Sequence, residues 1–236
     1  ETVVCPPGKV PTAEGYDKKS VVLTYWDIRG LGQPPRLALE AAGVSYTDVR
    51  INAGDDIESP TFKSAWTDVK GTVGLPAVNL PYVLDEGVQI SQSGAILRHI
   101  QRKYYAPLDL EAAALMDQTL EQCVDYDSPL TRMSYGSYYT GGFESWVKDI
   151  MPTGLAKLDA LLGDKTFFAG DVFTVADCKA FEALDKTRII YPPALASYPR
   201  LEAFLARVEQ VPNLAAYFAS DRYKARPINN PMAQFK

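Results

Sequence analysis

Apolar residues follow two different spacings along the chain, and the change falls near residue 104. The β-branched and aromatic run at residues 21–28 predicts a buried strand, and the alternation at 45–51 predicts a second one. The segment VNLPYVLDEGVQI, residues 78–90, predicts two short strands joined by a hairpin turn at Asp85-Glu86-Gly87. Beyond residue 104, leucines and aromatic residues recur every three or four positions, which predicts helices only.

Helices separate the predicted strands in the first part of the chain. Pro34 and Pro35 begin a short helix that ends at Gly43, and a further short helix or an ordered loop is expected around residues 62–70. The segment 91–104 is predicted to form the last helix of this part of the chain. The order strand, helix, strand, helix, strand, strand, helix predicts one mixed sheet flanked by helices. Pro81 lies just before the third strand, where a cis peptide bond is expected.

These patterns predict an α/β domain followed by an all-α domain. The first spans residues 21–103 and the second spans residues 111–236. Thr174 and Asp177 stand three residues apart, a spacing that is similar to a capping box and predicts a helix start. Residues 1–20 contain Pro6, Pro7, Gly8, Pro11 and Gly15 without periodicity, so we expect an irregular N-terminal extension there.

Composition narrows the possible partners. The net charge is −5 with mixed signs along the chain, which argues against nucleic acid as a partner. No stretch approaches the roughly 18 apolar residues of a membrane span. The three cysteines, Cys5, Cys123 and Cys178, lack metal-site or disulfide spacing, so a reducing compartment such as the cytoplasm is expected. With His99 as the single histidine, we expect no metal site.

Four motifs in order resemble the glutathione transferase family, and most closely its mu class. They are YWDIRGLGQPPRLALE, NLPYVLD with ISQSGAILRHIQRKY, FFAGDVFTVADCKAFEALD, and the final YPRLEAFLARVEQVPNLAAYFAS with PMAQF. The resemblance covers about Val21 to Phe235. It implies a thioredoxin-like βαβ-ββα domain before the helical domain, glutathione as co-substrate, and a homodimer.

Tyr25 is the candidate catalytic residue. A thiol with a pKa near about 8.5 is only about 3% thiolate at pH 7. A hydrogen bond to the sulfur is worth about 1.5–3 kcal/mol, which lowers the pKa by about 1–2 units. By position alone Tyr25 would more simply be a buried strand tyrosine, but the Trp-x-x-Arg-Gly-Leu motif that contains Trp26 favours the donor to glutathione.

The resemblance also implies which residues bind glutathione. Gln92 and Ser93 begin a helix, whose N–H groups and dipole suit the γ-glutamyl carboxylate, although ordinary capping explains them equally. Trp66 and Lys70 are four apart and would share a helix face, but a solvated lysine beside a tryptophan is the simpler explanation of the spacing. The implied set is Trp26, Leu31, Lys63, Trp66, Lys70, Asn79, Leu80, Gln92, Ser93 and, reaching the neighbouring subunit's glutathione, Asp125.

The second substrate would be a small hydrophobic electrophile, for which the resemblance implies Tyr135, Ser128 and Asn230. Ala77 stands where mu enzymes usually carry a phenylalanine that plugs into the partner subunit, so we expect a weaker or differently packed dimer. Two alternatives stay open beside conjugation. One is a glutathione-dependent isomerase or peroxidase on the same fold, and the other is a non-catalytic subunit of a larger assembly.

Overall fold

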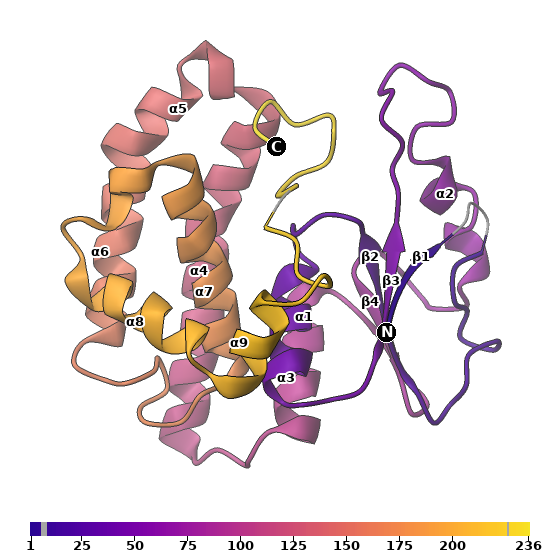
Figure 1. Cartoon of the computed structure of the whole chain (residues 1–236), viewed down its shortest axis with the longest axis horizontal. Coiled ribbons are helices and arrows are strands. Elements are labelled where there is room, and N and C mark those ends of the chain that lie inside the picture. The colour runs from indigo at the N-terminus through magenta and orange to yellow at the C-terminus, as the bar shows by residue number, and fades with distance from the viewer. Residues whose placement is uncertain (6–8, 226) are drawn as a thin grey trace. The chain divides into compact units, whose positions relative to one another are not determined.

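The computed structural model describes residues 1–5, 9–225 and 227–236, and it divides into two compact units. The first unit comprises residues 1–104 with 219–232 and 236, and the second comprises 105–218 with 233–235 (Figure 1). An α/β unit followed by a helical unit is the predicted fold class. The segment 219–232, predicted within the helical domain, instead packs with the first unit.

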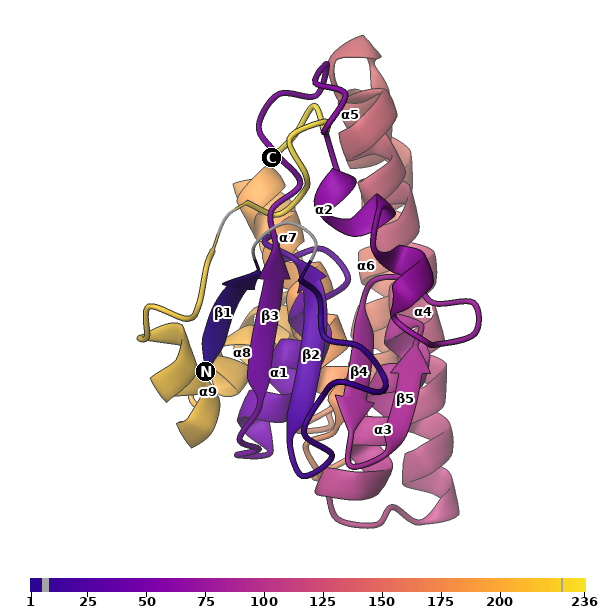
Figure 2. The ribbon, with the colours of Figure 1, turned by 90° about the vertical axis from the view of Figure 1, so that its right-hand side faces the viewer.

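The first unit contains a five-stranded sheet in the order β1-β3-β2-β4-β5 (Figure 2). Strands β1 and β2 run parallel to β3, whereas β4 is antiparallel to both β2 and β5. The strands are β1 (Thr2–Cys5), β2 (Val21–Trp26), β3 (Thr47–Ile51), β4 (Tyr82–Asp85) and β5 (Val88–Ser91). Glu86 and Gly87 form the β4–β5 turn with φ angles of 47° and 93°, and the Leu80–Pro81 bond is cis, as expected.

Helices cover both faces of this sheet. Helices α1 (Gln33–Ala41) and α3 (Ser93–Tyr104) lie on one face, and α2 (Ser64–Thr67) lies on the other (Figure 1). A 3-10 turn, η1 (Lys70–Thr72), follows α2. Trp66, Val69 and Val73 from this stretch join the buried core on the α2 side of the sheet.

Two predictions about local structure were wrong. Residues 1–20 are not irregular throughout, because Thr2–Cys5 forms the edge strand β1, although Pro6, Pro7 and Gly8 of this segment lie outside the described residues. A four-residue strand gives no clear local pattern, and its partner β3 is about 45 residues away. Trp66 and Lys70 do not share a helix face, since α2 ends at Thr67 and Lys70 begins the 3-10 turn.

The second unit is helical. Asp109 begins its longest helix, where its carboxylate accepts the N–H of Ala112 at 2.8 Å. Asp177 accepts the N–H groups of Thr174 and Phe168 at 2.7 and 2.9 Å at the start of α7, close to the predicted capping box. The elements are α4 (Leu110–Gly136), η2 (Tyr138–Thr140), α5 (Gly142–Ser145), η3 (Trp146–Ile150, a π-helix), α6 (Met151–Leu162), α7 (Val175–Ile190), η4 (Pro192–Leu195), α8 (Pro199–Glu209) and α9 (Pro212–Phe218). In the described part of the chain, no helix combines the length and apolarity needed to cross a bilayer.

Candidate functional site

Tyr25 stands near the end of β2, with its ring buried and its hydroxyl directed at the following turn. The hydroxyl oxygen accepts the backbone N–H of Leu31 at 3.0 Å. This bond uses a lone pair of the oxygen, so the O–H proton is the group with which Tyr25 can donate. A donor to a hydroxyl oxygen also polarises its O–H bond, which strengthens it as a donor.

Two glycines make room for the Tyr25 side chain. A Cβ atom at Gly30 would lie 2.6 Å from the Tyr25 hydroxyl oxygen, and one at Gly32 would lie 2.4 Å from Cδ1 of the ring. Both distances are shorter than van der Waals contact allows. The sequence Gly30-Leu31-Gly32 therefore lets the turn wrap closely around the phenol and present the Leu31 N–H to it.

Buried charges fix the segment that follows Tyr25. Arg36 on α1 and Arg50 on β3 both bind the carboxylate of Asp48, with Nε–O distances of 3.0 and 2.7 Å. Arg36 also donates to the carbonyl of Ile28 at 2.8 Å. Since all three charged side chains are almost fully buried, this network ties the turn after β2 to the sheet and to α1.

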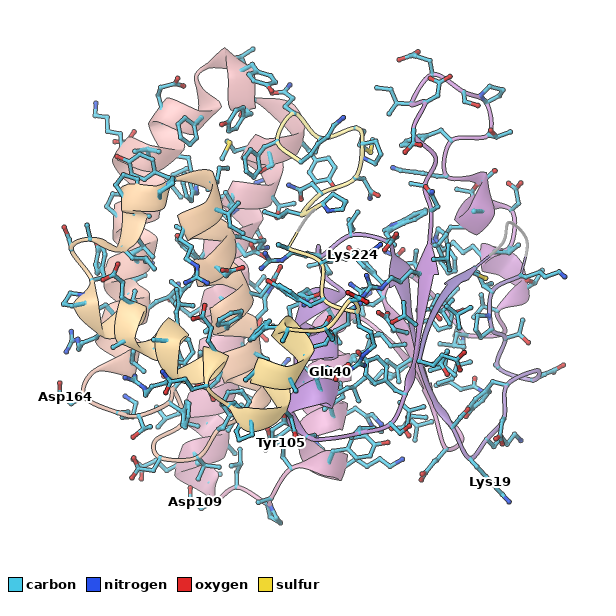
Figure 3. All side chains as sticks on the ribbon, viewed as in Figure 1. Lys19, Glu40, Tyr105, Asp109, Asp164 and Lys224 are labelled. Carbon is cyan, nitrogen blue, oxygen red and sulfur yellow. The ribbon has the colours of Figure 1, made fainter. Side chains whose placement is uncertain are left out.

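The C-terminal tail of the first unit is held to the same turn. Lys224, labelled in Figure 3, binds Asp27, and Arg50 lies 3.4 Å from the same carboxylate. Burial opposes the charge of Asp27, but the hydrogen bonds and positive charges of Lys224 and Arg50 together outweigh it and hold the pKa of Asp27 below its usual value. Arg222 of the tail pairs with Glu40 of α1, which Figure 3 also labels.

A pocket of about 600 Å³ lies on the α2 side of the first unit. It brings together three predicted glutathione-binding residues, Lys70, Asn79 and Gln92. Residues that were not predicted to bind glutathione complete its lining: Thr67, Gly71, Gly74, Leu75, Ala77, which was predicted at the dimer interface, and Val78. Their only sequence signal is that they lie between predicted site residues, mostly in the 70–79 stretch.

Four other predicted glutathione residues do not line this pocket. Trp66 is buried, and its ring stacks on that of Tyr82 at a centroid distance of 6.0 Å. Leu80 is also buried, in the same core. Lys63 lies at the start of α2, where its ammonium is 3.0 Å from the sulfur of Met232. Leu31 is 43% exposed and offers its N–H to Tyr25, as described above.

Gln92 adopts an unusual backbone conformation at the edge of the pocket. Its φ angle is 75°, in the left-handed region that non-glycine residues rarely occupy. Its carbonyl accepts the N–H of Ile96 at 2.9 Å, so Gln92 stands at the N-terminal end of α3, directly before Ser93. Strained residues at a pocket edge often position a ligand, and a helix N-terminus attracts carboxylates.

A second cavity, of about 160 Å³, contains Asn230, which is a predicted electrophile residue. The cavity lies between the ends of β2 and β3 and the tail. Tail carbonyls at Pro227 and Ile228 accept the N–H groups of Arg29 and Gly30, which join the tail to the turn around Tyr25. The remaining lining residues are Asp27, Ile28, Ile51, Asn52, Ala53, Asp55, Pro227 and Pro231.

Three predicted residues lie on α4 of the second unit: Asp125, Ser128 and Tyr135. Asp125 is exposed and lines a pocket of about 280 Å³ with Asp149 and Lys157. Ser128 and Tyr135 are partly buried. The structure therefore places this set within one helix, but it assigns no ligand to it.

The remaining candidates have structural surroundings. His99 on α3 lies 2.6 Å from the buried carboxylate of Asp85, which also accepts bonds from Lys103 and Tyr104. All three cysteines are free and buried. Among residues 1–5, 9–225 and 227–236, no group of three His, Cys, Asp or Glu gathers as a set of metal ligands would.

Comparison with known proteins gives the family. The model described as glutathione S-transferase, N-terminal domain, matches residues 21–102, and that of the C-terminal domain matches residues 125–221. The chain is 38% identical over 219 residues to glutathione S-transferase Mu 5 of Mus musculus. The aligned residues cover 92% of this chain and 96% of the mouse protein. The chain belongs to the glutathione S-transferase family. This confirms the resemblance drawn from the sequence motifs.

Other members of the glutathione S-transferase family show the same likeness. Glutathione S-transferase Mu 3 of Homo sapiens is 38% identical over 220 residues, with 92% of this chain and 96% of that one covered. Among solved structures, a Pi-class glutathione S-transferase of Onchocerca volvulus has a TM-score of 0.79 at 32% identity and covers 91% of this chain. The N-terminal family model begins only at residue 21, so residues 1–20 precede the part it matches.

Proposed function

We propose that this chain is a glutathione transferase that conjugates the glutathione thiolate to small hydrophobic electrophiles, and that Tyr25 is its catalytic residue. The observation that carries the proposal is the buried Tyr25 hydroxyl, oriented by the Leu31 N–H at the end of β2. The family membership supports glutathione as the co-substrate. The reaction needs a stabilised sulfur anion and an electrophile close to it, and it needs no base or metal.

Within the first unit, the pocket of about 600 Å³ is the proposed glutathione site. Lys70 supplies a positive charge for the glycyl carboxylate, while Asn79 and the main chain of Leu80 hold the cysteinyl part in an extended conformation. Gln92 and Ser93 bind the γ-glutamyl carboxylate at the start of α3. Trp26, Leu31, Lys63 and Trp66 complete the proposed set, although the structure gives Trp66 a buried, stacked position and Lys63 a contact with Met232.

The residues proposed to bind the electrophile are Tyr135, Ser128 and Asn230. Asn230 supports it most directly, since it lines the cavity beside the turn that wraps Tyr25. The Tyr135 hydroxyl would donate to negative charge that develops on the electrophile.

We also propose a cytoplasmic homodimer in which Asp125 binds the amine of the partner subunit's glutathione. The exposed carboxylate of Asp125 on α4 supports this role. Ala77 is exposed at the proposed plug position and has a φ angle of 51°. A methyl group buries little apolar surface, so the dimer would be weaker than one with a phenylalanine plug.

Calorimetric titration with glutathione, followed by turnover of an activated aryl halide, tests the function. We expect saturable glutathione binding and conjugation by the wild type. Binding without turnover of any electrophile would replace conjugation with the non-catalytic role. Turnover of an isomerisation or peroxide substrate alone would favour the isomerase or peroxidase alternative.

A further inference from the structure

We infer that residues 9–16, here called the N-terminal strap, are a positioning element that holds both walls of the glutathione pocket. This rests on the proposed function of that pocket. The strap stands before the part of the chain that matches the N-terminal family model, which begins at residue 21. It is therefore an addition to the family domain, and its contacts show what it adds.

The N-terminal segment is built into the first unit rather than attached loosely to it. Strand β1 pairs with β3 along its whole length, from Thr2 opposite Asp48 to Cys5 opposite Ile51. Beyond it, Val10 and Ala13 are buried, and Val10 joins the core on the α2 side of the sheet. Tyr16 packs against the same core.

Ala13 binds two residues that lie close in the chain to lining residues of the pocket. Its N–H donates to the carbonyl of Val73 at 2.8 Å, and Val73 directly precedes the lining residue Gly74. Its carbonyl accepts a bond of 3.4 Å from the side-chain amide of Gln89 on β5, the strand that leads into Gln92. One strap residue therefore links the segment around residue 74 to the strand behind Gln92.

Gly74 shows how closely the strap approaches the pocket wall. Its φ angle is +84°, and a Cβ atom there would lie 3.2 Å from the Cβ of Ala13. Only a residue without a side chain allows this approach without displacing the strap.

Two further hydrogen bonds extend the link. The Tyr82 hydroxyl donates to the carbonyl of Pro11 at 2.7 Å, and the Tyr82 ring stacks on Trp66. The Tyr16 hydroxyl accepts the N–H of Gly87 in the β4–β5 turn at 2.7 Å. The strap thus spans from Trp66 to the hairpin that ends beside Gln92.

The pocket wall needs such support because it has little regular structure of its own. Between Lys70 and Asn79 only the three-residue turn η1 is helical, and no strand is formed. Gly74 and Ala77 both have positive φ angles. A segment without repeating hydrogen bonds keeps its position through tertiary contacts, and the bond between Ala13 and Val73 is one of these.

The test compares glutathione affinity and turnover in full-length variants. Ala13→Pro removes the N–H that binds Val73, and Tyr82→Phe removes the bond to Pro11 while keeping the stacked ring. We expect the dissociation constant and the KM for glutathione to rise about three- to tenfold in each, as the loss of one hydrogen bond implies. We expect kcat at saturating glutathione to stay within about twofold, because Tyr25 is untouched.

Two matched controls separate positioning from general stability. Lys18→Pro places a proline elsewhere in the same N-terminal segment. Lys18 is the second residue of a turn in which the Ser20 N–H donates to the Asp17 carbonyl, and proline is favoured at this position of such a turn. Tyr46→Phe removes a buried hydroxyl that donates to Glu40 at 2.9 Å, away from the pocket. Both should keep wild-type glutathione affinity, although Tyr46→Phe lowers the free energy of unfolding.

The outcomes are distinct. If the wild type binds glutathione but Ala13→Pro and Tyr82→Phe bind it equally well, the strap inference is overturned and the proposed function stands. If the wild type binds no glutathione, the proposed function fails and the inference fails with it. Should Ala13→Pro not fold, the conservative Tyr82→Phe variant decides between these results.

Discussion

The hydroxyl oxygen of Tyr25 lies 3.0 Å from the backbone nitrogen of Leu31 and accepts its N–H. This bond orients the phenol from the turn that follows β2, with glycines on both sides of Leu31. The bond places the phenol oxygen beside the turn, and the catalytic proposal depends on the Tyr25 O–H donating to the glutathione sulfur.

Tyr25→Phe should lower kcat/KM for conjugation about 10- to 100-fold, because about 1.5–3 kcal/mol of thiolate stabilisation is lost. The KM for glutathione should change little, since the ring and the pocket residues remain. Steady-state kinetics with an activated aryl halide measure both quantities. Tyr46→Phe is the matched control, and unchanged turnover in Tyr25→Phe would remove Tyr25 from the mechanism.

Gly32→Ala should disrupt the same site through sterics. Its Cβ would lie 2.4 Å from the Tyr25 ring, so the ring or the turn must move. We expect both activity and the free energy of unfolding to fall, the latter by about 1–3 kcal/mol. In contrast, Gly136→Ala at the end of α4 meets no atom within 4 Å and should not lower stability. Equal stability of the two variants in urea denaturation would contradict this packing.

Gln92 allows backbone strain and ligand contact to be separated. Gln92→Gly relieves the positive φ angle but loses the side chain, so glutathione should bind more weakly while stability holds or rises slightly. Gln92→Ala loses the same side chain but keeps the strain, so it should be the less stable variant by about 1 kcal/mol. Calorimetric titration and urea denaturation give the two quantities. Wild-type glutathione affinity in both variants would show that the Gln92 side chain does not contact the ligand.

Asp48→Asn should be among the most destabilising single changes in the first unit. It leaves Arg36 and Arg50 buried without their shared carboxylate, which costs about 3–5 kcal/mol when a buried pair is broken. Asp159→Asn removes a partner of the exposed Arg200 and should lower stability far less, because water and salt screen an exposed pair. Chemical denaturation of both variants compares them directly, and similar losses would contradict the role assigned to the buried network.

The lowered pKa of Asp85 makes the free energy of unfolding depend on pH in the acid range. Burial opposes its ionisation, but bonds from Lys103, His99 and Tyr104 outweigh burial and hold the pKa of Asp85 below its ordinary value. A depressed folded-state pKa stabilises the fold at pH values above the unfolded-state pKa of about 3.9, and this contribution is lost as the pH falls through the folded-state value. Asp85→Asn should therefore flatten the loss of stability below about pH 5. Chemical denaturation at a series of pH values measures this, and a loss of stability at low pH that is the same in Asp85→Asn as in the wild type would contradict this assignment.

The sequence predicted those parts of the fold whose signals are local. The hairpin at Glu86-Gly87 and the strand that ends with Tyr25-Trp26 each carry their own pattern. Strand β1 could not be predicted in this way, because its four residues become a strand only by pairing with β3, distant in the chain. The prediction that Trp66 and Lys70 share a helix face was wrong because α2 ends after a single turn.

The candidate site likewise contains residues that the sequence predicted and contacts that it could not predict. Motif context pointed to Lys70, Asn79 and Gln92, which the pocket brings together. Nothing local to the sequence indicates that Ala13 would bind Val73, or that Arg36 and Arg50 would share Asp48. Such contacts arise from the packing of distant segments, and residue spacing does not encode them.

The pKa of the glutathione thiol bound to the wild type decides whether Tyr25 stabilises the thiolate. The ultraviolet absorbance of the thiolate, followed in the wild-type complex as pH rises, gives the pKa of the bound thiol. We expect a pKa about 1–2 units below the roughly 8.5 of a free thiol, and a return towards that value in Tyr25→Phe. A bound thiol that titrates like free glutathione in the wild type would contradict it.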